Sequence, residues 1–113
     1  LRLMICNYED ERLGMIDVFD LEPRDNRAAL GILIANKEHR GKGYGSEVLQ
    51  LISNYCFIHL GLHQVYANVL ADNLPSIQLF EKNGFTKAGV LKEWILLKGK
   101  YKDEILYQLI HVH

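Results

Sequence analysis

The stretch that decides the fold is Arg40-Gly41-Lys42-Gly43-Tyr44-Gly45, where three glycines alternate between an apolar segment and a long amphipathic one. Glycine permits positive φ and lets a ligand approach the backbone closely. The first turn of a helix has four N–H groups without an intrahelical partner, and together with the helix dipole they attract anions. Arg40 and Lys42 add positive charge, and Ser46 adds a hydroxyl. The run therefore predicts a loop that holds a pyrophosphate at the start of a helix.

Two common phosphate-binding motifs do not describe this loop. The Walker pattern GxxxxGK[ST] is absent, which argues against a P-loop nucleotide site. The dinucleotide pattern GxGxxG would start at Gly41, but Ser46 stands where its third glycine belongs. The acidic residue expected about 20 positions further on is also missing. A simpler reading, in which the glycines only form a tight connection between a strand and a helix, stays open on these residues alone.

Three strands are expected before the glycine run. The segments Leu3–Asn7 and Leu13–Phe19 read as an antiparallel hairpin. A loop rich in polar residues follows, broken by Pro23 and Asn26. The next strand, Ala28–Ala35, is apolar on both faces, which is typical of a strand in the middle of a sheet.

The segment after the glycine run predicts a helix, a short strand and a second helix. The first helix begins at about Gly43 and ends before Gly61, and Gln64–Leu70 is the strand. The apolar stripe of the first helix recurs at three- and four-residue intervals and consists of Val48, Leu49, Ile52, Tyr55, Cys56 and Leu60.

The second helix has start and stop signals at both ends. Asp72-Asn73 caps it, and Pro75 lies in its first turn. Gly84 ends it, and its apolar face is formed by Ile77, Leu79 and Phe80. The chain then reads as a hairpin of Phe85–Leu97 and Tyr101–Val112 around the turn Lys98-Gly99-Lys100.

The expected order is therefore β-β-β-α-β-α-β-β in an α/β (α+β) fold. The strand, helix and strand between residues 28 and 70 form a right-handed βαβ crossover. The 113 residues fit a single domain, 1–113, and the composition is that of an ordinary globular protein, with 49% hydrophobic and 24% charged residues.

Composition excludes several classes of function. The net charge is −1 and no basic stripe is visible, so no nucleic-acid partner is expected. The apolar runs are short, and no membrane association is expected. No signal peptide is recognisable, which predicts a cytoplasmic protein. The chain opens at Leu1 already inside a strand-like pattern, so we expect that its N-terminus is truncated.

No metal site is expected. The two cysteines, Cys6 and Cys56, are far apart in apolar segments and are predicted to be reduced and buried. Neither has a second Cys at metal-ligand spacing, and the five histidines are scattered along the chain.

Two segments of the chain together resemble the GNAT superfamily of N-acetyltransferases. Arg40-x-x-Gly43-x-Gly45 matches the family signature (Q/R)-x-x-G-x-(G/A). The run from Asn73 to Phe85, NLPSIQLFEKNGF, is similar to the family's N-x-x-(A/S)-x-x-L-Y-x-x-x-GF segment. The C-terminal residues, with Tyr101-Lys102-Asp103 after the turn, look like the ending of the diamine (spermidine) and ribosomal-protein acetyltransferase branch.

The resemblance implies a fold and a co-substrate. The fold would be the GNAT fold, a central mixed and largely antiparallel sheet with an acetyl-CoA-binding βαβ crossover. The third strand would splay from Gln64–Leu70, and its exposed backbone would pair with the pantetheine arm of acetyl-CoA. The residues implied in acetyl-CoA binding are Leu33, Ile34, Ala35, Arg40, Gly41, Lys42, Gly43, Tyr44, Gly45, Ser46, Asn73, Ser76, Phe80 and Lys82. For Asn73, a role as a plain helix cap is an equally good interpretation, and one side chain can do both.

Acetyl transfer to an amine needs proximity, a deprotonated amine, a polarised thioester carbonyl and a proton for the leaving thiolate. A backbone N–H of the Leu33–Ala35 strand is the expected donor to the thioester oxygen, and neither cysteine needs to act as a nucleophile. In many members of the family a tyrosine in the second helix protonates the thiolate, but this chain has Phe80 at the matching position. Tyr66, Asn68 or a water is then the candidate proton donor, or the thiolate leaves unassisted, or activity is lost.

The acceptor side is less well determined by the sequence. Asp17, Asp20 and Glu22 lie on or just after the second strand, where family acceptors approach, and could attract a cationic amine. As an alternative, they are three solvated carboxylates at a strand end, which is the more common situation. The family's opening strand and pair of helices, one wall of the acceptor groove, have no counterpart here, and uncovered apolar surface would favour a homodimer or higher oligomer.

The sequence thus leads to one main functional hypothesis and two rivals. The main hypothesis is acetyl transfer from acetyl-CoA to a primary amine, which is a polyamine, another small amine or a protein N-terminus. The first rival is a weakly active or inactive acetyl-CoA-binding or regulatory module, because of Phe80 and the missing opening. The second is a dinucleotide-binding fragment, which the strand order and Ser46 disfavour.

Overall fold

The computed structural model describes residues 1–6, 12–34 and 44–112, and its secondary structure follows the predicted order. In these residues there are six strands and two helices. They are β1 (Arg2–Cys6), β2 (Arg12–Glu22), β3 (Arg27–Ile34), α1 (Tyr44–Ile58), β4 (Gln64–Leu70), α2 (Leu74–Lys82), β5 (Thr86–Leu97) and β6 (Lys100–Ile110). The largest difference from expectation is β2, which continues past Phe19 to Glu22 through an irregularity in its pairing with β3.

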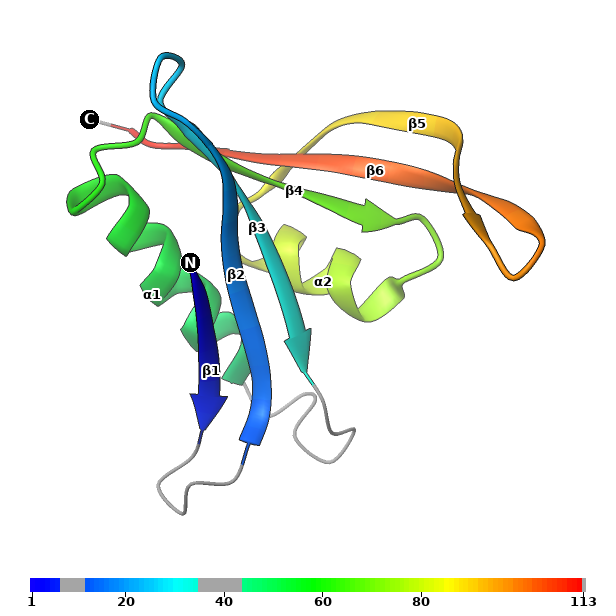
Figure 1. The fold of residues 1–113 in the computed structure, drawn as a ribbon, viewed down its shortest axis with the longest axis horizontal. Coiled ribbons are helices and arrows are strands. Elements are labelled where there is room, and N and C mark those ends of the chain that lie inside the picture. Colours follow the sequence, from blue (N-terminus) through cyan, green and yellow to red (C-terminus); the bar gives the residue numbers. More distant parts are fainter. Residues whose placement is uncertain (7–11, 35–43, 113) are drawn as a thin grey trace.

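The strands form one mixed sheet in the order β1-β2-β3-β4-β6-β5 (Figure 1). Only β3 and β4 pair in parallel, and the other four pairings are antiparallel, which confirms the predicted mixed, largely antiparallel sheet. The last strand of the chain, β6, lies between β4 and β5, so β5 forms an edge of the sheet. The parallel pair is joined by α1, as the expected βαβ crossover requires.

The core lies between one face of the sheet and the two helices. Strand β4 contributes its alternate residues Val65, Ala67 and Val69 to this core. Their partners on β6 are Leu109, Tyr107 and Ile105, respectively. From α1 the core receives Leu49, Ile52, Ser53 and Cys56. The predicted apolar stripe was wrong for two residues, Tyr55 and Leu60, because their side chains are 38% and 40% exposed. Ser53 takes a core position that the pattern of apolar residues did not reveal.

Local signals in the sequence account for the element ends. Gly61 has φ +66° just after α1, and the N–H of Leu62 reaches back to the carbonyl of Cys56, as in a helix C-cap. Between β5 and β6 the two loop residues, Lys98 and Gly99, both have positive φ, as a type I′ hairpin turn requires.

Asp103 stabilises an irregular segment of the edge strand. The pairing of β5 with β6 shifts between Leu91 and Ile95, where Glu93 has φ +51°. The Asp103 carboxylate accepts the backbone N–H of Glu93 at 2.8 Å and the ammonium of Lys92 at 3.1 Å. The hydrogen bond from Glu93 and the neighbouring Lys92 lower the pKa of Asp103. Edge irregularities of this kind disfavour pairing with another strand.

The cysteines are both free, but their surroundings differ. Cys56 is buried in the core, and burial raises the pKa of its thiol. Cys6 is exposed, so the prediction that both thiols are buried was wrong for Cys6. It is near the end of an edge strand, where an apolar pattern does not guarantee a covering layer. Neither α1 nor α2 is long and apolar enough to cross a membrane.

Candidate active site

The candidate site begins where the two parallel strands separate. β3 and β4 are paired only at Arg27–Ala29 and Gln64–Tyr66, although β3 continues to Ile34 and β4 to Leu70. Figure 1 shows the two strands diverging beyond this point. Their facing edges therefore carry backbone N–H and C=O groups that have no partner on the opposite strand. Such edges can bind an extended chain with amide groups as if it were an added strand.

Both helices begin downstream of the separated strand ends. α1 follows β3 in the chain, and α2 begins shortly after the end of β4. Helix N-termini present unpaired N–H groups and positive potential, which suits an anionic ligand. Of the predicted glycine loop, Tyr44, Gly45 and Ser46 form the first turn of α1 and are half-buried. The predicted positions Ala35, Arg40, Gly41, Lys42 and Gly43 lie outside the described residues.

The strand side of the predicted cofactor site is partly open. Leu33 is 55% exposed near the end of β3, although its strand lies between two others in the sheet. Ile34 is the last residue of β3 and is paired with Gly14 of β2. Both residues lie in the part of β3 that has left β4, which is where the resemblance places the acetyl-CoA arm.

Asn83 joins the two helices, a role that the sequence did not reveal. Its side-chain amide donates to Ser46 Oγ at 3.0 Å and to the carbonyl of Leu79 at 2.8 Å, and its oxygen accepts from Gln50 at 2.9 Å. The first turn of α1 is thereby tied to the end of α2. An Asn before a helix-ending Gly is an ordinary turn signal, so the local pattern gave no hint of this longer-range contact.

Three predicted residues of α2 lie along its surface. Asn73 is the N-cap, and its side-chain oxygen accepts the backbone N–H of Ser76 at 3.3 Å. Asn73 is exposed, and no hydrogen bond of its amide nitrogen is found within the described part of the chain. Ser76 is half-buried, and Lys82 is exposed at the last turn.

Phe80 differs from the other predicted residues because it belongs to the core. It is 2% exposed, and its ring packs edge-on against Phe85, with centroids 5.0 Å apart. It also stacks with Tyr107 at 6.2 Å. Tyr107 is itself 1% exposed and donates its hydroxyl to Glu81 at 2.8 Å.

The Tyr107 hydroxyl gives stability a pH dependence. Burial, followed by the Glu81 carboxylate, raises the pKa of Tyr107 from 10.0 to about 12. Because the folded state holds this proton more tightly, the stabilisation is complete below pH 10 and is lost as pH rises from 10 towards 12. We expect Tyr107→Phe to lower the free energy of unfolding by about 1–2 kcal/mol at neutral pH.

The difference in free energy of unfolding between wild type and Tyr107→Phe should become smaller above pH 10. Urea unfolding across this pH range measures it, and taking the difference between the two proteins cancels the contributions that they share. Tyr101→Phe is the matched control, since Tyr101 is 64% exposed. A gap that stays constant to pH 12 would contradict the assigned role of the Tyr107 proton.

Tyr66 and Asn68 lie on the face of the sheet opposite the helices. Strand alternation puts them there, because the neighbouring Val65, Ala67 and Val69 face the core. Tyr66 is half-buried at the last paired position of β4, and Asn68 is exposed where β4 has left β3. Asn68 therefore lies beside the separated edges of β3 and β4, which is where a group that assists proton transfer to a ligand between the strands must lie.

The sequence prediction missed Glu104, which shares this face with Asn68. Glu104 of β6 is paired with Leu70 of β4, two residues along from Asn68, and is half-buried. Its position became visible only when β6 was seen beside β4. A carboxylate at this place can attract a cationic amine.

The three acidic residues predicted for the acceptor side are not brought together. Asp17 forms a two-pronged ion pair with Arg2, at 2.7 and 3.1 Å, and this hydrogen bonding lowers the pKa of Asp17. Asp20 and Glu22 lie at the irregular end of β2, and Glu22 is paired with Arg27 at the end where β3 and β4 are still joined. Glu22 also accepts the backbone N–H of Arg24 at 3.1 Å. Asp17 alone is level with the separated part of β3, opposite Gly31.

In residues 1–6, 12–34 and 44–112, no group of three or more His, Cys, Asp or Glu side chains could hold a metal ion.

A parallel strand pair that separates, with a helix starting after each strand, suits an extended ligand that has amide groups and an anionic end. The family model of the GNAT acetyltransferase domain matches residues 1–86, so the chain belongs to the GNAT acetyltransferase family. This confirms the resemblance drawn from the two sequence segments.

Similar proteins include curated N-acetyltransferases. The SPbeta prophage-derived uncharacterized N-acetyltransferase YokL of Bacillus subtilis is 34% identical over 94% of this chain and 59% of its own length. The spermidine N(1)-acetyltransferase of Vibrio cholerae is 28% identical over 90% of this chain and 58% of its own. The chain therefore spans about three fifths of the length of these relatives.

Solved structures confirm the fold. The spermidine N-acetyltransferase of Vibrio cholerae in its dodecameric form superposes with a TM-score of 0.88. It is 27% identical and covers 96% of this chain and 63% of that one. The F149A mutant of the same enzyme superposes with a TM-score of 0.89, again at 27% identity, over 96% of this chain and 64% of that one.

Proposed function

We propose that this chain binds acetyl-CoA and transfers its acetyl group to a primary amine of a small cationic molecule, with polyamines as the first class to test. The observation that carries the proposal is the separation of β3 and β4 after three paired residues. Family membership and the name of the Vibrio cholerae relative support the choice of co-substrate and acceptor.

The separated strands fit the co-substrate. The edges of β3 beyond Ala29 and of β4 beyond Tyr66 offer peptide groups to the amides of a pantetheine arm. The first turn of α1, with Tyr44, Gly45 and Ser46, would receive the pyrophosphate. Acetyl-CoA supplies an activated thioester, so the chain needs no nucleophile of its own.

The reaction requires the chain to orient two groups and to manage two protons. The ammonium first loses one proton to solvent water. The neutral amine nitrogen then bonds to the acetyl carbon while the carbon–sulfur bond breaks, and the nitrogen releases a second proton to water. A backbone N–H of β3 near Leu33 would hold the carbonyl oxygen. Tyr66 through water, or a water held by Asn68, would deliver a proton to the departing sulfur, and Glu104 would attract the ammonium form of the acceptor.

The test is a pair of measurements on the chain. Calorimetry should show saturable binding of acetyl-CoA and none of NAD. A free-thiol assay with spermidine should then show CoA release that depends on both substrates. Absence of acetyl-CoA binding by the folded chain would overturn the proposal. Binding without thiol release across a panel of amines would instead support the second candidate, an acetyl-CoA-binding module, which the buried Phe80 at the usual acid position favours.

Asn73 allows the cap role and the ligand role to be separated. Asn73→Ala should lower the free energy of unfolding by about 1 kcal/mol, because the N–H of Ser76 loses its acceptor. Asn73→Asp keeps a capping oxygen but lacks the amide donor and adds a negative charge beside an anionic ligand. We expect Asn73→Asp to keep wild-type stability in urea and to lose acetyl-CoA affinity severalfold by calorimetry. Wild-type affinity in Asn73→Asp would show that Asn73 is only a cap.

We further expect self-association. The edge hairpin exposes Trp94, Leu96 and Tyr101, each at least 59% exposed, which is an unusual amount of large apolar surface on two strands. A solved spermidine N-acetyltransferase from Vibrio cholerae is described as dodecameric. Sedimentation of the chain and of a Trp94→Lys variant tests this, and identical monomeric behaviour of both would contradict it.

A further inference from the structure

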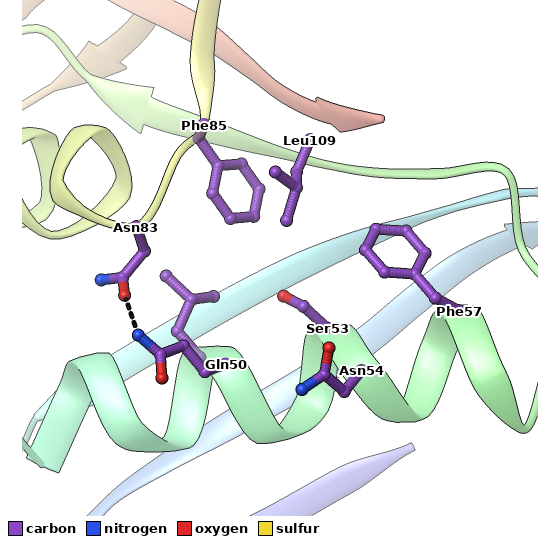
Figure 2. Close-up of a pocket in the computed structure, with 8 residues that line it drawn as sticks. Gln50, Ser53, Asn54, Phe57, Asn83, Phe85 and Leu109 are labelled. Atoms are coloured by element: carbon purple, nitrogen blue, oxygen red, sulfur yellow. Dashed lines mark hydrogen bonds between the residues drawn. The ribbon is translucent and has the colours of Figure 1, made fainter. Parts of the chain in front are cut away.

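A cavity of about 260 Å³ lies between α1 and the end of α2, apart from the separated strands. Figure 2 shows its lining: side chains from α1 on one side, and Asn83, Phe85 and Leu109 on the other. The residues predicted to bind acetyl-CoA that lie in the described part of the chain are absent from this lining, which consists of Leu49, Gln50, Ser53, Asn54, Phe57, Asn83, Phe85 and Leu109.

The cavity contains a buried hydroxyl with an unmet hydrogen bond. Ser53 is 4% exposed, and among the described residues its Oγ has no hydrogen-bond partner. In Figure 2 this oxygen points into the space bounded by Phe85 and Leu109. A buried hydroxyl without a partner is costly, so natural proteins nearly always provide one, either from the chain or from a bound molecule.

The neighbouring polar groups do not provide that partner. The amide of Asn83 is engaged by Ser46, Leu79 and Gln50. Gln50 and Asn54 are exposed and form the rim of the cavity, whereas Leu49 and Phe85 are buried and form its floor. The interior of the cavity is therefore apolar apart from the Ser53 hydroxyl, and its entrance is polar.

The lining defines the chemistry of an occupant. Among the described residues, none that lines the cavity is Lys, Arg, His, Asp or Glu, so these residues offer no counter-charge to a phosphate or an ammonium group. Apolar side chains, two of them aromatic, surround the remaining space. A cavity of about 150 Å³ lined by such residues binds benzene, and pockets for drug-sized ligands start at about 300 Å³. The volume of this cavity, about 260 Å³, lies between the two and suits a small molecule with one ring.

We propose that this cavity is a binding site for a small uncharged molecule that has one apolar ring and one hydrogen-bonding group directed at Ser53. The site is separate from acetyl transfer and does not depend on it, because its residues and its chemistry differ from those of the separated strands.

Benzyl alcohol is the probe, with toluene as the matched molecule that lacks the hydroxyl. Titration of the ¹⁵N-labelled chain, followed by amide chemical shifts, should show saturable changes confined to residues 49–57 and 83–85. We expect benzyl alcohol to bind about fivefold more tightly than toluene, the ratio that one ordinary hydrogen bond provides. Ser53→Ala should abolish that ratio while toluene affinity is kept.

A second pair of variants tests the site even if Ser53→Ala does not fold. Asn54→Trp places a large side chain at the rim of the cavity and should weaken the binding of both probes more than fivefold. Leu51→Trp is the control, because Leu51 is also exposed on α1, at 64%, but does not line the cavity. Shifts that do not saturate, that scatter over the surface, or that are the same in Asn54→Trp would overturn the proposal and leave water as the partner of Ser53.

Discussion

Phe80→Tyr is expected to accelerate acetyl transfer by about 10²–10⁴-fold, the range that a positioned general acid contributes. By the sequence resemblance, Phe80 matches the position at which many members of the family carry a proton-donating tyrosine, and phenylalanine has no proton to give. The added hydroxyl would lie in a tightly packed group, since the Phe80 ring contacts Phe85 at 5.0 Å and Tyr107 at 6.2 Å between centroids. If it found no partner, the free energy of unfolding would fall by about 1–3 kcal/mol.

The measurement is single-turnover thiol release with spermidine, as a function of pH. A tyrosine acid must be protonated, so the gain in rate should disappear as pH rises through its pKa. Phe85→Tyr is the matched control: Phe85 is 4% exposed and belongs to the same aromatic pair, but it does not occupy the family position. A Phe80→Tyr rate equal to that of wild type would contradict the expectation that a hydroxyl at this position acts as the acid.

Ile105→Ala is expected to lower the free energy of unfolding by about 2–5 kcal/mol. Ile105 is 6% exposed on β6, with Val69 of β4 on one side and Val90 of β5 on the other. Removing its side chain leaves a cavity that the neighbouring strands cannot close without breaking their pairing. Since a domain of this size has a total stability of roughly 5–15 kcal/mol, the loss would be a large part of the whole.

The control is in the same strand. Ile110→Ala makes the same chemical change at a position that is 51% exposed, and it should cost less than about 1 kcal/mol. Urea unfolding of both variants, with the slope of free energy against denaturant checked for constancy, gives the comparison. Equal losses in the two variants would contradict the burial of Ile105 between β4 and β5.

Much of the candidate site could be predicted because its signals are local. The cap of α2 is an example: Asn73 accepts the N–H of Ser76 three residues on, and Pro75 lies between them. The turn at Lys98 and Gly99 is another, because the conformation of a two-residue loop depends on those two residues. The two family segments are local in the same sense, and they were sufficient for the family.

Other parts could not be read from the sequence. The pattern of α1 placed Tyr55 in the core and Ser53 outside it, because an apolar stripe does not say which neighbour will cover it. Glu104, Tyr107 and Asn83 acquire their roles from segments distant in the chain. The hydrogen bond from Gln108 to Gln64, for instance, spans 44 positions.

The sequence by itself determined the order of elements, their caps and turns, and the membership of the GNAT family, since each of these depends on residues close together along the chain. Only the tertiary structure decided that β6 lies between β4 and β5, that β3 and β4 part after three residues, and that Ser53 faces a cavity. The physical reason is that strand order, register and burial are set by contacts between surfaces that meet only after the chain has folded. The opening between β3 and β4, where the proposed chemistry takes place, is such a feature.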